Sequence, residues 1–199
     1  MATPIEFYFD FSSPYGWFAA EQIEALAARH GREALWRPIL LGAVFKITGQ
    51  QPLVTIPLKG RYAEHDMLRS ARACGLPFRK PTRFPIATAA ACRACYSITD
   101  RDPAAAKKLA LALYRAYFTE DRDISAAAVV TAVATGLGLD AAAIGAAIDD
   151  AAVKERLRLE IETAVARGVF GSPYLIVDGE PFWGADRLDQ VARWLEQPW

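Results

Sequence analysis

A serine that precedes a helix is the first group in this sequence with a position suited to chemistry. Ser13 stands directly before Pro14, and proline suits the first position of a helix because its missing N–H is not needed there. A serine in front of it can cap the helix with its side-chain oxygen. A helix N-terminus, with its free N–H groups and partial positive charge, also stabilises a nearby anion. Ser13 is therefore either a cap alone or a group that stabilises a bound anion.

The residues around Ser13 predict a buried strand followed directly by a helix. Every second residue over 5–11 is apolar, which is the period of a strand with one buried face. Over 14–30 the apolar residues recur at helical spacing, and Gly31 is a typical stop just after the last turn. These two elements hold Ser13 at their junction.

A second candidate for chemistry, the pair Cys92 and Cys95, has redox spacing in unsuitable surroundings. It lies within an alanine-rich helical stretch, with no strand before it and no cap that begins a helix at the first cysteine. A metal would need further ligands, and the only histidines are His30 and His65. We interpret the pair as helix packing and predict no metal site.

The composition predicts a soluble globular protein in the cytoplasm. Its 199 residues are 53% hydrophobic, which suffices for one domain with a sizeable core and excludes a disordered chain. Lys and Arg (23) balance Asp and Glu (23), so charge gives no reason to expect nucleic acid or a membrane as partner. No apolar run reaches the roughly 18 residues of a membrane span. The sequence shows no secretory signal, and its three cysteines are too few for a disulfide framework.

The next part of the chain predicts one strand and then mostly helices. Residues 34–41 read as a second strand, and Pro38 either places it at a sheet edge or makes it leave the sheet early. Residues 42–57 read as a loop with at most one short helix, and 59–74 as a helix. Residues 86–152 are alanine-rich and predict four helices or more, with plausible starts at three acidic sites, namely Asp123 to Ser125, Asp140 and Asp149-Asp150.

The last part predicts a helix, a hairpin and a closing helix. The helix covers 154–167, and strands cover 174–177 and 180–183. The Asp-Gly pair between the two strands is a strong signal for a two-residue turn. The closing helix covers 186–195. The whole order predicts an α/β fold, a sheet covered by helices on both faces and interrupted by an all-helical insertion.

The segment Phe-Asp-Phe-Ser-Ser-Pro-Tyr, residues 9–15, resembles the active-site segment of two related families. These are the 2-hydroxychromene-2-carboxylate isomerases and the kappa-class glutathione transferases, which share a thioredoxin-like fold with the periplasmic disulfide oxidoreductases. In those oxidoreductases a Cys-x-x-Cys begins this helix, whereas here Ser13 and Gly16 stand at the two cysteine positions. The resemblance implies that Ser13 is catalytic and interacts with the sulfur of bound glutathione.

A second motif, Gly-Val-Phe-Gly-Ser-Pro-Tyr over 168–174, surrounds the Ser172–Pro173 bond. By general preference the bond is trans, since only about 5–6% of X–Pro bonds in folded proteins are cis. The resemblance implies the opposite, because thioredoxin-like folds place a cis-proline beside the active-site helix. It also implies that the backbone of Ser172 pairs with the cysteinyl part of glutathione. The alternative is an ordinary tight turn into a strand.

A third motif, Phe-Trp-Gly-Ala-Asp-Arg over 182–187, closely resembles a segment of the same families. The resemblance implies that Asp186 receives the γ-glutamyl ammonium of glutathione and that the backbone at Ala185 and Asp186 holds its carboxylate. A helix N-cap is the other role for Asp186. Arg187 is an ion-pair partner or a ligand, and the sequence leaves both open.

The segment Pro-Leu-Lys over 57–59 resembles the families' Pro-x-Lys segment and implies that Lys59 approaches glutathione. Two departures accompany it. The families often carry an asparagine shortly before this segment, where residues 49–51 are Gly-Gln-Gln, and another after Phe-Pro-Ile, where this chain has Ala87. The contacts made by those asparagines are not carried over to this chain.

Together the motifs imply one DsbA-like unit over 1–199. Its thioredoxin-like part covers 1–58 and 154–199, and the helical insertion covers 59–153. The implied activity is a glutathione-dependent isomerase that interconverts 2-hydroxychromene-2-carboxylate and trans-o-hydroxybenzylidenepyruvate by reversible thiol addition, in aromatic, naphthalene-type catabolism. Glutathione would be the cofactor, a small aromatic carboxylate the substrate, and the assembly a homodimer. The alternatives are a kappa-class-like glutathione transferase and a non-catalytic thioredoxin-like binding module.

Overall fold

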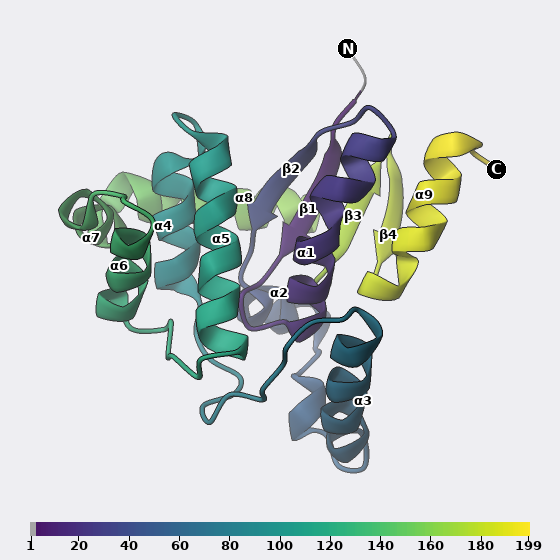
Figure 1. Ribbon diagram of the computed structural model, residues 1–199, viewed down its shortest axis with the longest axis horizontal. Helices are drawn as coiled ribbons and strands as arrows, with labels where there is room; N and C mark the ends of the chain where they lie inside the picture. The colour runs from purple at the N-terminus through teal and green to yellow at the C-terminus, as the bar shows by residue number, and fades with distance from the viewer. Residues whose placement is uncertain (1–2) are drawn as a thin grey trace.

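A four-stranded sheet is the centre of the computed structural model, which describes residues 3–199 (Figure 1). The strands are β1 (Ile5–Phe9), β2 (Ala34–Pro38), β3 (Tyr174–Val177) and β4 (Glu180–Trp183), in the order β2-β1-β3-β4. β1 pairs parallel with β2 and antiparallel with β3, and β3 pairs antiparallel with β4. Pro38 thus lies in an edge strand, as predicted. An edge strand pairs on one side only, so the N–H that proline lacks is not needed for the other side.

Nine α-helices and two short 3₁₀ helices are found within residues 3–199. The α-helices are α1 (Pro14–Arg29), α2 (Leu41–Thr48), α3 (Lys59–Ala73), α4 (Ala89–Thr99), α5 (Pro103–Phe118), α6 (Ala127–Gly136), α7 (Ala141–Asp149), α8 (Ala151–Ala166) and α9 (Leu188–Glu196). The 3₁₀ helices are η1 (Leu53–Thr55) and η2 (Ala185–Arg187). Figure 1 shows α1 in front of the sheet, α8 behind it, and α4–α7 grouped beside it.

The two faces of the sheet bury different residues of the same strands. On the α1 face, Phe7 and Phe9 of β1 are fully buried and stack with ring centroids 5.0 Å apart. On the opposite face, Tyr8 packs in a smaller cluster with residues of α2 and α8, among them Val44 and Ala164. The predicted period of two in β1 and the helical cover on both faces are therefore confirmed. Each buried phenylalanine contributes about 1.5–3 kcal/mol.

Side-chain caps fix the starts of several helices. Asp140 accepts from the first free amides of α7, and Asp150 does the same for α8, both at predicted positions. The predicted start at Asp123 to Ser125 is wrong, because α6 begins at Ala127. The Asp123 carboxylate instead closes a turn by accepting from the backbone N–H and the hydroxyl of Ser125.

Two further elements differ from expectation. The second strand, expected over 34–41, ends at Pro38, and the short helix expected after it is α2, which begins at Leu41. The closing helix begins as η2 before α9 continues from Leu188. The Asp178-Gly179 turn forms as predicted, with φ of 52° and 91° at its two residues. The insertion boundaries at 59 and 153 stay a prediction, since α4 and α5 share one core with α1 and the sheet.

Candidate active site

The fold brings Ser13 into contact with Ser172. The Ser13 Oγ donates to the backbone carbonyl of Ser172 at 2.8 Å and accepts from the Gly16 N–H at 3.0 Å. Both serines are largely buried, with 6% and 9% of their surface exposed. Ser13 is therefore the cap of α1, as predicted, and at the same time a hydroxyl that faces the Ser172 turn.

The Ser172–Pro173 peptide bond is cis. The expectation from the resemblance is confirmed, and the general preference for trans does not hold at this bond. The Pro173 carbonyl accepts from the Gly184 N–H at 3.1 Å, and this bond ties the turn to η2. Because η2 also contacts α1, the motifs at 9–15, 168–174 and 182–187 meet at one end of the sheet. The Phe84–Pro85 bond is cis as well, which the sequence did not lead us to expect.

Asp186 lies inside η2 and does not cap it. The N-cap position belongs to Gly184, which makes no side-chain cap, so the N-cap interpretation is wrong. The Asp186 carboxylate pairs with the Arg187 guanidinium at 3.0 Å, and 71% of the Asp186 side chain is exposed. Such an exposed ion pair contributes only about 0–1 kcal/mol, so both side chains can rearrange at little cost.

Several backbone donors at this end of the sheet have no partner. The N–H groups of Ser172, Ala185 and Asp186 donate to no atom of residues 3–199. The donors at Ala185 and Asp186 stand at the start of a 3₁₀ turn, where a carboxylate can be held. Three of the residues that the resemblance assigns to glutathione therefore present free backbone donors of the kind that a peptide-like ligand requires.

Lys59 stands apart from this group. It is an exposed residue at the start of α3, and its ammonium forms no hydrogen bond or ion pair within the described chain. α3 itself is tied to α1 through Tyr15, whose hydroxyl donates to the Asp66 carboxylate. Leu58, just before Lys59, adopts a left-handed φ of 67° and is 91% exposed. The structure thus brings Ser13, Ser172, Pro173, Ala185 and Asp186 together and leaves Lys59 as a separate, unpaired cation.

Comparison with known proteins gives the family. The sequence profile of the DSBA-like thioredoxin domain matches residues 4–196. The chain belongs to this family. It is 30% identical to a 2-hydroxychromene-2-carboxylate isomerase of Sphingobium xenophagum, over 98% of this chain and 99% of that protein. It is also 30% identical to glutathione S-transferase kappa 2 of Caenorhabditis elegans, over 98% of this chain and 92% of that protein.

A solved structure agrees with this assignment at the level of the fold. The structure of a 2-hydroxychromene-2-carboxylate isomerase superposes with a TM-score of 0.87 at 24% identity, covering 98% of this chain and 95% of the other. The predicted fold class, a thioredoxin-like sheet with helices on both faces and a helical insertion, is confirmed. The resemblance to the isomerase and kappa-class families is confirmed as well.

Gly16 shows how this DSBA-like domain fills the second cysteine position. A Cβ atom at Gly16 would lie 2.7 Å from the Ser172 Oγ, 2.7 Å from the Tyr114 hydroxyl oxygen and 3.2 Å from the Ser13 Cβ. Real Cβ atoms do not approach other heavy atoms as closely as the two 2.7 Å distances, so a side chain at position 16 requires these two hydroxyl groups to move. The space for a second thiol is occupied by two hydroxyl groups.

Asp10 and Tyr114 belong to the site but were not identified from the sequence. Asp10 is 3% exposed, and burial raises the pKa of its carboxyl group. Tyr114 of α5 is fully buried and donates to the Asp10 carbonyl at 2.9 Å. An acidic residue among the aromatics of 7–11 was a visible signal for the first. Nothing in the local sequence marks the second.

The two cysteines of the Cys-x-x-Cys motif lie inside α4, as predicted. Both Cys92 and Cys95 are buried and free, and burial raises the pKa of each thiol well above its usual range. A raised pKa keeps a thiol protonated and poorly reactive. Helix packing therefore accounts for the pair, as we interpreted it from the sequence.

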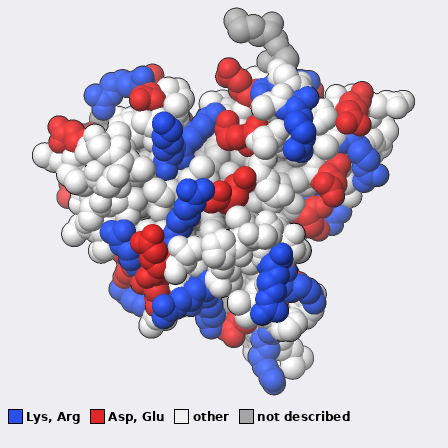
Figure 2. Space-filling model, in the orientation of Figure 1, with Lys and Arg blue, Asp and Glu red and all other residues white. Residues whose placement is uncertain are grey.

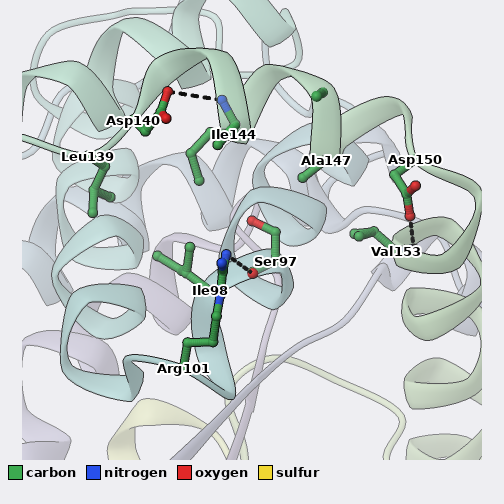
Figure 3. A pocket seen from close by; sticks show the side chains of 11 residues that line it. Ser97, Ile98, Arg101, Leu139, Asp140, Ile144, Ala147, Asp150 and Val153 are labelled. Carbon is green, nitrogen blue, oxygen red and sulfur yellow. Dashed lines mark hydrogen bonds between the residues drawn. The ribbon is translucent and has the colours of Figure 1, made fainter.

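A separate cavity of about 500 Å³ lies between α4, α7 and α8 (Figure 3). None of its lining residues is a predicted site residue. Its polar groups serve the fold, since Asp140 and Asp150 cap helices and Arg101 donates to the Ser97 carbonyl. This cavity therefore lies among packed helices and is separate from the site around Ser13.

The charge distribution is also that of an ordinary globular surface. Figure 2 shows positive and negative side chains interspersed over the visible face, in keeping with the formal charge of zero. Within residues 3–199 no helix is long and apolar enough to cross a membrane.

Proposed function

We propose that the protein is a glutathione-dependent isomerase that interconverts 2-hydroxychromene-2-carboxylate and trans-o-hydroxybenzylidenepyruvate. One observation carries the proposal. The Ser13 hydroxyl, at a helix N-terminus, contacts the backbone of the residue before a cis-proline, in a chain related over nearly its whole length to a protein with this isomerase name. We further propose that the reaction belongs to aromatic catabolism of the naphthalene type in the cytoplasm and that the enzyme is a homodimer.

Glutathione fits the donors and acceptors that this end of the sheet offers. In the proposal the backbone of Ser172 pairs with the cysteinyl part, and the amides of Ala185 and Asp186 hold the γ-glutamyl carboxylate. The Asp186 carboxylate exchanges its exposed partner Arg187 for the γ-glutamyl ammonium. Lys59 contributes a cation from α3. The Pro173 ring fixes the turn from which Ser172 faces the ligand.

Ser13 acts on the thiol and does not attack the substrate. A serine hydroxyl needs an adjacent base to become a nucleophile, and the Ser13 hydroxyl donates to a backbone carbonyl instead. In the proposed site its O–H turns to the sulfur and, with the helix N-terminus, favours the thiolate. Bound glutathione supplies a nucleophile that adds to the conjugated substrate and leaves again, which permits rotation about the bond that conjugation holds double. Glutathione is regenerated in each cycle.

A kappa-class-like glutathione transferase is the second candidate function. It is favoured by the 30% identity to glutathione S-transferase kappa 2 of Caenorhabditis elegans. Both activities would use the same thiolate, so the arrangement around Ser13 does not separate them. Consumption of glutathione does, because a transferase forms a conjugate and an isomerase returns the cofactor.

An absorbance assay on 2-hydroxychromene-2-carboxylate tests the proposal. We expect isomerisation only when glutathione is present, with the total glutathione unchanged after many turnovers. Stoichiometric loss of glutathione with a conjugating substrate, and no isomerisation, would favour the transferase. Failure of the protein to bind glutathione in calorimetry would favour a non-catalytic thioredoxin-like binding module and refute both enzymatic functions.

A further inference from the structure

The Asp10 carboxylate joins three parts of the chain that surround Ser13. Its Oδ1 accepts from the Ser12 N–H at 2.7 Å and from the Thr88 hydroxyl at 2.9 Å. Its Oδ2 accepts from the Leu41 N–H at 2.6 Å. Leu41 is the first residue of α2, and Thr88 directly precedes α4. One buried side chain therefore holds the start of α2, the start of α4 and the turn before α1 in fixed relation.

The backbone of Asp10 continues the same connection into the site. Its N–H donates to the Ser172 Oγ at 2.9 Å. Its carbonyl accepts from the Ser13 N–H and from the Tyr114 hydroxyl, each at 2.9 Å. Asp10 thus contacts both serines of the candidate site directly, and a shift of Asp10 would move them together.

The Asp10 carboxylate is buried among hydrogen-bond donors and neutral titratable groups. The titratable groups that face it are Cys92 from α4 and Tyr114 and Tyr117 from α5, all neutral near pH 7, and α2 faces it only with a backbone amide. No lysine or arginine of residues 3–199 forms a hydrogen bond or an ion pair with it. Burial raises the pKa of Asp10, and the three hydrogen-bond donors lower it. Two of these donors are backbone N–H groups, which can only donate, so they favour the ionised form.

We propose that Asp10 is a positioning residue of this site. It holds Ser13 and Ser172 in their relative positions, and its buried charge opposes the ionisation of a thiol beside Ser13. The proposal rests on the proposed function for its meaning, since a bound thiol is what the charge would act on. An anion disfavours a second anion nearby. Ser13 and the helix N-terminus favour the ionised thiol. The balance between these opposing effects matters because the best attacking thiol has a pKa close to the ambient pH.

A cysteine introduced at position 13 reports on this charge without glutathione. In Ser13→Cys, the pKa of the introduced thiol is measured from the pH dependence of alkylation, with the wild type giving the background of the three native cysteines. Adding Asp10→Asn keeps the shape of the side chain and removes the charge. We expect the pKa of the introduced thiol to fall by about one unit. A shift of this size is typical of removing one nearby charge in partly buried surroundings.

The matched control is Thr88→Val in the same background. It removes one hydrogen bond to Asp10 and keeps the charge, so it should lower the melting temperature and leave the pKa of the introduced thiol at its starting value. An unchanged or raised thiol pKa in Ser13→Cys/Asp10→Asn would overturn the proposal. Where that variant does not fold, the carboxyl resonance of labelled Asp10 in wild-type protein decides, because a protonated carboxyl at neutral pH would also overturn it.

This test separates the inference from the proposed function. The charge effect is read on a thiol of the chain itself and needs no ligand. Calorimetry with glutathione on the wild type reports on the proposed function alone. A lowered thiol pKa together with no glutathione binding would therefore retain the role of Asp10 and refute the isomerase, and the reverse pair of results would refute Asp10 alone.

Discussion

Replacement of Ser13 by alanine tests the site through both stability and chemistry. The hydroxyl makes two hydrogen bonds in a nearly dry environment, one to the Ser172 carbonyl and one from the Gly16 amide. Loss of a serine cap costs about 0.5–2 kcal/mol. Loss of a neutral hydrogen bond costs about 0.5–1.5 kcal/mol more. We expect Ser13→Ala to lower the free energy of unfolding by roughly 1–3.5 kcal/mol.

That loss is measurable by thermal unfolding. For a domain of this size each kcal/mol lowers the melting temperature by about 2–4 °C, so a fall of roughly 2–14 °C is expected. Ser13→Thr is the matched control, because it keeps the hydroxyl and should retain more of the stability. A melting temperature equal to that of the wild type would show that the two hydrogen bonds contribute nothing to stability.

The chemical consequence depends on pH in a defined direction. If Ser13 donates to the glutathione sulfur, its removal raises the pKa of the bound thiol and lowers the thiolate fraction at neutral pH. The rate of Ser13→Ala should then be low at neutral pH and recover in part as the pH rises, while glutathione still binds in calorimetry. Turnover as fast as wild type at neutral pH, or a wild type that needs no glutathione, would refute this mechanism.

Three further changes test other parts of the site. Gly16→Ala should cost about 1–3 kcal/mol, since its methyl group would overlap two buried hydroxyl groups; denaturation curves matching those of the wild type would contradict this. Asp186→Ala should weaken glutathione binding by on the order of 1.5–3 kcal/mol through loss of a charge-assisted contact, and equal affinities in calorimetry would remove Asp186 from the ligand site. Cys92→Ala with Cys95→Ala should leave turnover intact despite some loss of stability, whereas a folded but inactive variant would mean that the pair has a role beyond packing.

Local patterns were sufficient to predict most of the elements of this fold. The alternation of apolar residues over 5–11 and the Asp-Gly turn predicted β1 and the hairpin, because both depend on near neighbours. Ser13, Asp140 and Asp150 cap helices at their predicted places for the same reason. Motif resemblance was needed for the cis state of Ser172–Pro173, which propensity alone had favoured as trans.

What the sequence did not reveal depends on contacts between distant parts of the chain. α2 begins at Leu41 with its amide bonded to the Asp10 carboxylate, 31 residues earlier, so its start carries no local cap signal. Tyr114 reaches the site from a helix 104 residues after Asp10. Asp186 fails as a cap because Gly184, at φ 116°, takes the N-cap position, so η2 starts two residues earlier than a cap at Asp186 would require. Such pairings appear only once the chain has folded.

These long-range contacts show how this thioredoxin-like fold places hydroxyl groups, and no thiol, at the start of α1. The helix N-terminus and the cis-proline turn are retained, and each supplies polar groups to one end of the sheet. The first cysteine position holds a hydroxyl bound to the Ser172 carbonyl, and the second is closed at Gly16 by the hydroxyl groups of Ser172 and Tyr114. A chain built in this way has no pair of sulfur atoms to oxidise at this site. In the proposed function the thiol is therefore supplied by glutathione. Ser13 favours the ionisation of this thiol, and Asp10 opposes it.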